Sequence, residues 1–143
     1  TALREACTQS VVSVLTMPPR QAKAAVKATR PRVYARVKPN VGDDAGAAEL
    51  FTIDDTTLEY IKEEGAEPTK FGFDKVFDGK STQEEIFEDV GETSLRALRQ
   101  GFNSTVMAYG QTGAGKSFSM EGAAGNQGLV PRIFKRSFEL FGG

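Results

Sequence analysis

Histidine and tryptophan are absent from this 143-residue sequence, and cysteine occurs only once. A single thiol cannot form a disulfide within the chain, and a metal site built from several Cys or His ligands is excluded. No apolar run approaches the roughly 20 residues of a membrane-spanning helix. The first residues also lack the charged-then-apolar layout of a secretory signal. These absences favour a protein of a reducing compartment, without a membrane partner.

The charge of the chain is nearly balanced but unevenly distributed. The net charge is −1, so the overall basic character typical of DNA- and RNA-binding proteins is missing. Residues 1–38 contain eight Lys or Arg and one acidic residue, whereas residues 39–92 contain sixteen acidic residues and four Lys. The basic arm is either a solvated extension or a contact for an acidic partner.

The first thirty residues are expected to precede the domain. Helical spacing of apolar residues predicts a short amphipathic helix over residues 2–15, with its apolar positions at Leu3, Cys7, Val11 and Val14. The sequence MPPR that follows ends this helix, because proline lacks an amide donor. We therefore place an N-terminal basic extension or linker at residues 1–30 and the start of the domain near Pro31.

Alternating apolar and polar residues predict short strands in the first half of the domain. Residues 33–38 place Val33, Ala35 and Val37 on one face and Tyr34, Arg36 and Lys38 on the other. Residues 50–53 and 57–61 indicate a hairpin around an acidic turn. Residues 70–77 are expected to form one further strand that turns Phe71, Phe73 and Val76 toward the core.

Residues 81–103 contain the clearest helix and lead into another strand. Thr82 and Glu85 have the spacing of a capping box, in which each side chain satisfies a free amide at the helix start. Gly91 is expected to weaken the helix by ~1 kcal/mol relative to Ala, and Gly101 to end it. Residues 104–109, STVMAY, follow as a buried strand. The expected apolar face of the helix consists of Ile86, Phe87, Val90, Leu95 and Leu98.

The next segment, AYGQTGAGKSFSMEG at residues 108–122, contains a phosphate-binding motif. Gly110, Gly115, Lys116 and Ser117 match the pattern G-x-x-x-x-G-K-[ST] completely. Glycines in such a loop let successive backbone amides point at phosphate oxygens. The lysine brings a positive charge to the β- and γ-phosphates, and the serine hydroxyl can bind Mg²⁺. A buried strand before the loop and a helix from about Lys116 give the motif the context that it needs.

The alternative interpretation is an ordinary glycine-rich turn without a ligand. The four fixed positions match a random site at roughly 5 × 10⁻⁵, or under ~1% for a chain of this length. The motif therefore favours a phosphate-binding loop.

The neighbouring segments extend the match to a family. AYGQTGAGKSFSM resembles the phosphate loop of the kinesin motor family, AYGQTGSGKT. Four other segments agree in the same order: RVYARVKP with the first strand and its R-x-R-P motif, FGFDKVF with FxFDxVF, TQEEIFEDV…LRQGFNSTV with the next helix and its GYN turn, and GLVPRIFKRSFELF with G-I-I-P-R. The resemblance runs from about Arg32 to Phe141.

The resemblance implies a nucleotide site made from separate parts of the chain. Arg36 and Pro39 match the Arg and Pro that border the adenine and ribose in kinesins, and Lys38 stands where the family has a second Arg. Phe118 matches the residue that packs on the adenine, where an aromatic face suits base stacking. The alternative interpretation of Phe118 is a core residue in the first turn of the helix. The residues implied to hold the triphosphate are Gly110, Gln111, Thr112, Gly113, Ala114, Gly115, Lys116 and Ser117, with Lys116 and Ser117 as catalytic residues and Ser117 as metal ligand.

The resemblance also implies a fold class and an incomplete domain. We expect an α/β fold of the P-loop NTPase type, with a central twisted, mostly parallel sheet flanked by helices. Residues 31–143 would be the N-terminal half of a kinesin-like motor domain, truncated before switch I, because neither NxxSSRSH nor DxAGxE occurs in the chain. With exposed sheet edges and no switches, we expect the fragment neither to fold stably alone nor to hydrolyse ATP.

The function implied is that of the nucleotide-binding half of an ATP-driven microtubule motor. Its cofactors would be ATP or ADP with Mg²⁺. Its partners would be tubulin in microtubules and the remainder of the motor domain, with no DNA, RNA or membrane partner. The location would be the cytoplasm and cytoskeleton, including cilia. The alternative is a kinesin-like structural subunit of a microtubule or ciliary assembly with weak or lost ATPase activity.

Overall fold

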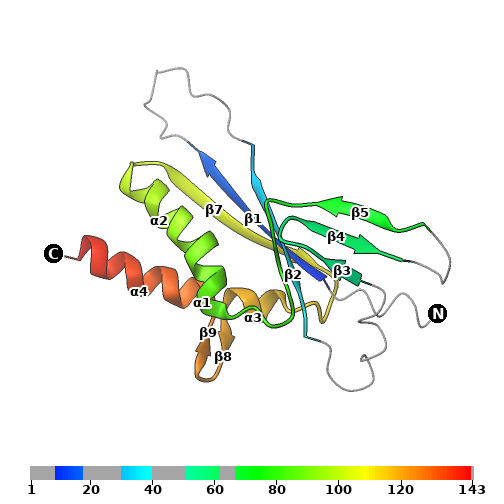
Figure 1. Ribbon diagram of the computed structural model, residues 1–143. Coiled ribbons are helices and arrows are strands. Elements are labelled where there is room, and N and C mark those ends of the chain that lie inside the picture. Colours follow the sequence, from blue (N-terminus) through cyan, green and yellow to red (C-terminus); the bar gives the residue numbers. More distant parts are fainter. Residues whose placement is uncertain (1–8, 18–29, 40–50, 62–66, 143) are drawn as a thin grey trace.

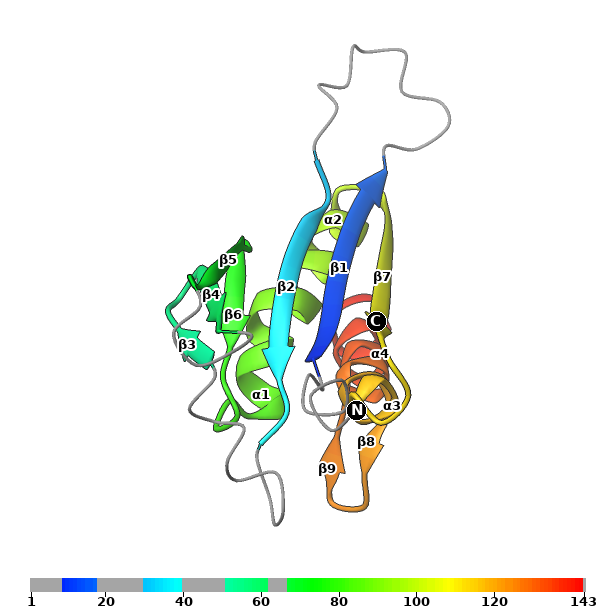
Figure 2. The same cartoon turned by 90° about the vertical axis from the view of Figure 1, so that its right-hand side faces the viewer.

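A four-stranded sheet forms the centre of the molecule (Figure 1). The computed structural model describes residues 9–17, 30–39, 51–61 and 67–142. Across the sheet the strands lie in the order β6 (Lys75–Phe77), β2 (Arg32–Val37), β1 (Gln9–Met17) and β7 (Asn103–Gly110). The helices cover one face of this sheet, and a smaller antiparallel sheet lies on its other side (Figures 1 and 2). The α/β fold class is therefore confirmed.

Strand β1 replaces the helix that was predicted for residues 2–15. That prediction is wrong for residues 9–15, and residues 2–8 lie outside the described part of the chain. The segment QSVVSVLTM is rich in β-branched residues, which favour strands. Both of its backbone edges pair, one with β2 and one with β7. Two ladders of backbone hydrogen bonds outweigh a weak helical periodicity in so short a segment.

The directions of the strands bring two chain segments to the same edge of the sheet. Strand β1 runs antiparallel to both β2 and β7, so β2 and β7 run in the same direction, and β6 is parallel to β2. The sheet is therefore mixed, with two antiparallel pairs and one parallel pair, and the expectation of a mostly parallel sheet is wrong for the described strands. Val37 pairs with Gln9, and Gly110 pairs with the neighbouring Ser10. The carboxyl ends of β2 and β7 consequently flank one end of β1, at the edge where open α/β sheets bind ligands.

Strand β2 is covered on both faces. Tyr34 and Ala35 are 4% and 0% exposed, so the predicted alternation holds but neither face is polar surface. Tyr34 joins the main core beneath the helices, and Ala35 joins a small core with Leu58 and Val76 beneath the second sheet. The main core consists of Tyr34, Phe77, Ile86, Phe87, Val90, Leu95 and Leu129.

The second sheet contains the predicted hairpin. Strands β3 (Phe51–Ile53), β4 (Thr57–Tyr60) and β5 (Thr69–Gly72) pair antiparallel in that order. The single strand predicted over residues 70–77 is wrong: the chain leaves this sheet after β5 and enters the central sheet as β6. The change of sheet leaves Phe71 47% exposed, whereas Phe73 and Val76 face the small core as predicted.

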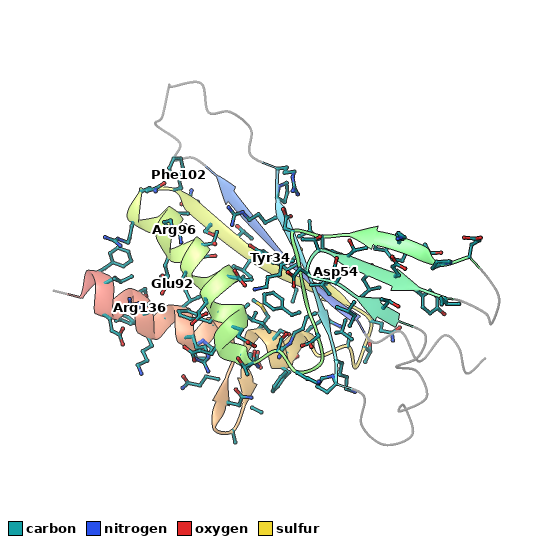
Figure 3. The ribbon with its side chains drawn as sticks, viewed as in Figure 1. Tyr34, Asp54, Glu92, Arg96, Phe102 and Arg136 are labelled. Atoms are coloured by element: carbon teal, nitrogen blue, oxygen red, sulfur yellow. The ribbon has the colours of Figure 1, made fainter. Side chains whose placement is uncertain are left out.

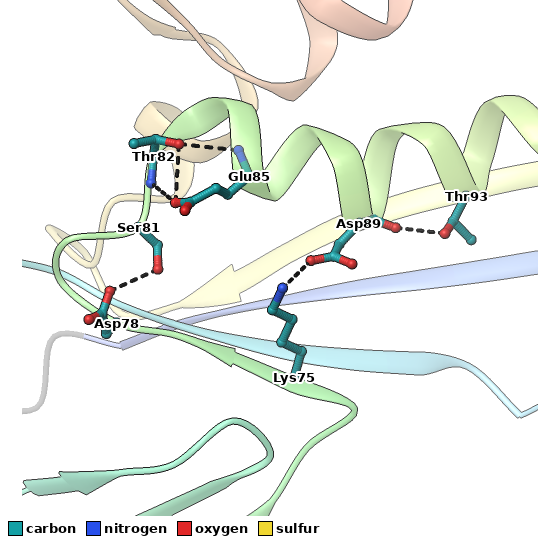
Figure 4. Close-up of polar contacts among 7 residues, drawn as sticks. All are labelled: Lys75, Asp78, Ser81, Thr82, Glu85, Asp89 and Thr93. Atoms are coloured by element: carbon teal, nitrogen blue, oxygen red, sulfur yellow. Dashed lines mark hydrogen bonds and ion pairs between the residues drawn. The ribbon is translucent and has the colours of Figure 1, made fainter.

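The long helix of residues 83–99 has the predicted start and end. Thr82 and Glu85 form the reciprocal capping box (Figure 4). The helix runs as α1 (Gln83–Ile86), a π-helical turn η3 (Phe87–Gly91) and α2 (Glu92–Arg99). Gly101 has φ 79°, and the amide of Phe102 donates to the carbonyl of Ala97, which closes a Schellman motif. Only the prediction for Leu98 is wrong, because this residue is 42% exposed.

The C-terminal part continues the helical layer. Helix α3 (Lys116–Met120) is followed by a hairpin of β8 (Gly122–Ala123) and β9 (Asn126–Gln127), and then by α4 (Leu129–Phe141). Helix α4 packs beside η3 and α2, where Arg136 pairs with Glu92 at 3.4 Å (Figure 3). Among the described helices, none has the length and apolarity to cross a membrane.

Strand β7 lies where it was predicted, but it is not buried. It is an edge strand, and its side chains alternate between the helical layer and solvent. Met107 and Tyr109 are 60% and 75% exposed, because no described element covers that face of β7. The buried strand expected for residues 104–109 is thus a half-exposed one.

Candidate functional site

The phosphate-loop motif connects the end of β7 to the start of α3. Gly113 and Gly115 have φ values of 83° and 89°, a region that residues with a β-carbon rarely adopt. No atom lies within 4 Å of a β-carbon built at either position, so backbone conformation, and not crowding, requires glycine there. The turn between them is anchored by Ala114, which is 2% exposed and donates its amide to the carbonyl of Gln111 at 3.2 Å.

Lys116 folds over its own loop. Its Nζ donates to the carbonyl oxygens of Gly110 and Gln111, at 2.8 and 2.6 Å. A lysine ammonium has three donors, so one remains for another acceptor. The contacts hold the charge at the mouth of the loop and brace the first two residues of the motif.

A cavity of about 330 Å³ opens beside the loop. Thr112, Gly113, Gly115, Lys116, Ser117 and Phe118 line it. The Ser117 side chain is exposed, and its hydroxyl makes no hydrogen bond within the described part of the chain. An ammonium donor and a free hydroxyl therefore face the same space.

A second cavity, of about 380 Å³, lies beside the first, and Gly115 and Phe118 line both. It is enclosed by the end of β2, the segment that leads into α1, and α3. The residues that line it are Arg36, Val37, Lys38, Pro39, Asp78, Gly79, Lys80, Ser81, Thr82, Gln83, Ala114, Gly115, Phe118, Ser119 and Asn126. Its volume is in the range of pockets that hold small ligands.

Arg36 is a buried cation on the wall of the second cavity. It is 8% exposed, and its Nη1 donates to Oε1 of Gln83 at 3.1 Å and to Oγ of Ser119 at 2.8 Å. Its guanidinium carbon lies 4.9 Å from the centre of the Phe118 ring, a cation–π contact. Burial lowers the pKa of Arg36, but arginine stays charged in proteins. Within the described residues no carboxylate pairs with it.

The structure gathers the predicted site residues around these two adjoining cavities. Arg36, Pro39 and Ala114 line the second cavity, and Thr112, Gly113, Lys116 and Ser117 line the first. Gly110 and Gln111 contribute the carbonyls that hold Lys116.

Sequence reasoning missed Gln83 and Ser119, the two partners of Arg36. Gln83 lies inside the capping box, and the capping pattern assigns a role only to the residues on either side of it. Ser119 lies two residues after the motif and carries no signal of its own. The feature that distinguishes both residues is a polar side chain at a buried helical position, and burial cannot be read from the sequence.

Comparison with known proteins gives one consistent result. The family model for the kinesin motor domain matches residues 26–142. Kinesin-like protein KIN-14B of Oryza sativa subsp. japonica is 37% identical over 108 residues, which cover 75% of this chain and 13% of that protein. Kinesin-like protein KIF15 of Strongylocentrotus purpuratus is 36% identical over 121 residues, with 76% and 8% covered.

A solved structure shows the same fold. The structure of KIF14 with ADP in complex with a microtubule superposes with a TM-score of 0.62 at 21% identity, covering 75% of this chain and 32% of that one. The chain thus spans about a third of that structure and a much smaller share of the curated relatives. Strand β1 lies N-terminal to the range that the family model matches.

Proposed function

This chain belongs to the kinesin motor domain family, and from that premise we propose that it binds Mg·ATP and Mg·ADP in the two adjoining cavities. The observation that carries the proposal is the phosphate loop itself, with its two left-handed glycines, its lysine at the mouth and an open cavity beside it. The fold match to a structure that contains ADP supports it.

The triphosphate would lie in the cavity of the loop. Lys116 would turn its third donor to the phosphates. The backbone amides of Gly113, Gly115, Lys116 and Ser117 would point at the phosphate oxygens as well, whereas the amide of Ala114 is already bonded to the carbonyl of Gln111. The residues present fit Mg²⁺, because the unpaired hydroxyl of Ser117 is the hard oxygen donor that this ion prefers. The ion would neutralise phosphate charge.

The nucleoside would occupy the second cavity. Pro39 and Arg36 form its wall, and the ring of Phe118 stands between the two cavities. Because the guanidinium of Arg36 covers one face of this ring, a base that stacks on the ring would use the opposite face.

For the complete gene product we propose an ATP-driven motor on microtubules, located on the cytoskeleton. The support is the family membership, together with a structural neighbour that is itself in complex with a microtubule. Residues 1–143 by themselves are not expected to hydrolyse ATP, because they contain neither switch motif.

The test is the affinity of the complete gene product for Mg·ATP before and after Lys116→Ala. We expect a loss of about 10- to 100-fold, the effect of removing a charged hydrogen-bond donor. Lys135→Ala is the matched control, because Lys135 is exposed on α4 and makes no ion pair within the described residues. Equal affinities for wild type and Lys116→Ala would refute the assignment.

A further inference from the structure

The side chain of Gln83 connects the two elements that carry the proposed nucleoside residues. Gln83 is the first residue of α1 and is 2% exposed. Its Oε1 accepts from Nη1 of Arg36 on β2 at 3.1 Å, and its Nε2 donates to the backbone carbonyl of Phe118 on α3 at 2.6 Å. One amide thus uses its acceptor and one of its two donors to join three elements that are distant in sequence.

The helix itself does not require an amide at this position. The capping box already satisfies the amides of Thr82 and Glu85 at the start of α1, and neither of its bonds uses the side chain of Gln83. Any good helix former at position 83 would serve the helix equally well. The buried amide is therefore explained by its contacts across the site and not by local structure.

The amide also suits the charge of Arg36. The two hydrogen-bond partners of this guanidinium among the described residues, Gln83 and Ser119, are uncharged. A carboxylate in place of the amide would offset the buried positive charge and could not donate to the Phe118 carbonyl. Glutamine is the side chain of this length that accepts from the guanidinium and donates to the carbonyl without adding a negative charge.

We propose that Gln83 is a positioning residue of the nucleoside cavity, which holds Arg36 and the Phe118-bearing turn in fixed relation to each other. The inference rests on the proposed function, because it assumes that a nucleoside enters this cavity. Gln83 acts through its two neighbours: it orients the guanidinium over one face of the Phe118 ring and so fixes the face that is left for the base.

The phosphate loop should be much less dependent on Gln83. Lys116 is held by Gly110 and Gln111, and the turn at Ala114 is held by Gln111. None of these contacts involves α1. Loss of Gln83 should therefore weaken recognition of the nucleoside and spare recognition of the phosphates, a separation that general destabilisation would not produce.

The test compares two probes, Mg·ADP and Mg·tripolyphosphate, on the complete gene product and its Gln83→Met variant. We expect the affinity for ADP to fall about tenfold, as for the loss of buried hydrogen bonds, and the affinity for tripolyphosphate to stay unchanged. In the ATPase reaction KM for ATP should rise while kcat is retained. Gln100→Met, the same substitution at an exposed position of the same helical region, is the matched control.

A second variant keeps the test decisive if Gln83→Met fails to fold. Gln83→Glu preserves the size of the side chain and the acceptor for Arg36 but loses the donor to Phe118. It should therefore also lower the affinity for ADP and leave the affinity for tripolyphosphate unchanged. Equal losses for both probes, or no loss for either, would overturn the positioning role while the proposed function stands. A wild-type protein that binds neither probe would refute the proposed function instead.

Discussion

The ring of Phe87 lies against the backbone of Gly91, one helical turn further along. A β-carbon at position 91 would stand 2.4 Å from Cδ2 of Phe87 and 2.7 Å from its Cε2. Phe87 is 8% exposed in the main core, so its ring has little room to move away. Gly91 is therefore required for close packing, and the π-helical turn that begins at Phe87 ends at this glycine.

Gly91→Ala should destabilise the protein, although alanine is the better helix former. Overpacking a core costs about 1–3 kcal/mol, which over most of this range exceeds the ~1 kcal/mol gained in helix propensity. The measurement is the thermal or urea midpoint of the complete gene product. Gly72→Ala is the control, because a β-carbon there meets no atom within 4 Å. A midpoint raised by Gly91→Ala would contradict the packing argument.

Asp74 should make stability fall in acid. It accepts two hydrogen bonds from Arg30, at 2.6 and 2.9 Å, and one from the amide of Val33 at 2.8 Å. These contacts lower the pKa of Asp74, the Arg30 hydrogen bond most of all. A lowered folded-state pKa stabilises the fold above the ordinary value of about 3.9, and this contribution is lost as pH falls through the folded value.

Asp74→Asn isolates that charge, because the amide oxygen can still accept from Val33. We expect a small loss of stability at pH 7, since the partner Arg30 is largely exposed. The difference between variant and wild type should shrink as pH falls below about 4. Thermal midpoints measured from pH 7 to pH 3 test this, and a constant difference across that range would contradict it.

Pairing with strand β1 should protect the backbone amides of β2 and β7 from hydrogen exchange. Residues 9–14 pair with β2 and residues 10–17 pair with β7. Deleting residues 1–17 exposes both edges, so amide exchange in β2 and β7 should accelerate at least about tenfold. Deletion of residues 1–8 alone is the control, and the amides of α2 are an internal reference. Unchanged protection after the longer deletion would show that β1 does not pair there in solution.

The isolated 143-residue chain should associate and should not unfold cooperatively. Phe134, Phe138 and Phe141 of α4 are 60%, 70% and 53% exposed, and Met107 and Tyr109 form a second apolar area on β7. Exposed apolar patches of this kind promote association. Sedimentation velocity and urea unfolding measure the outcome, and Phe134→Ser with Phe138→Ser should reduce association while Lys135→Ser does not. A monomer with a sharp transition would contradict this prediction.

The sequence by itself determined the features that depend on a few neighbouring residues. The capping box of Thr82 and Glu85, the helix end at Gly101 and the left-handed glycines of the phosphate loop were all predictable. Each is decided by bonds and torsion angles within one turn of the chain. The phosphate-loop residues belong to this class as well, because they are consecutive and their spacing is itself the signal.

Only the tertiary structure decided the features whose partners lie far away in sequence. Residues 9–17 form a strand because β2 and β7 each offer an edge to pair with. The segment around Phe73 contributes β5 to one sheet and β6 to the other. Gln83 entered the site through partners 47 and 35 residues away. Burial and pairing are properties of the assembled molecule, so no local pattern could have supplied them.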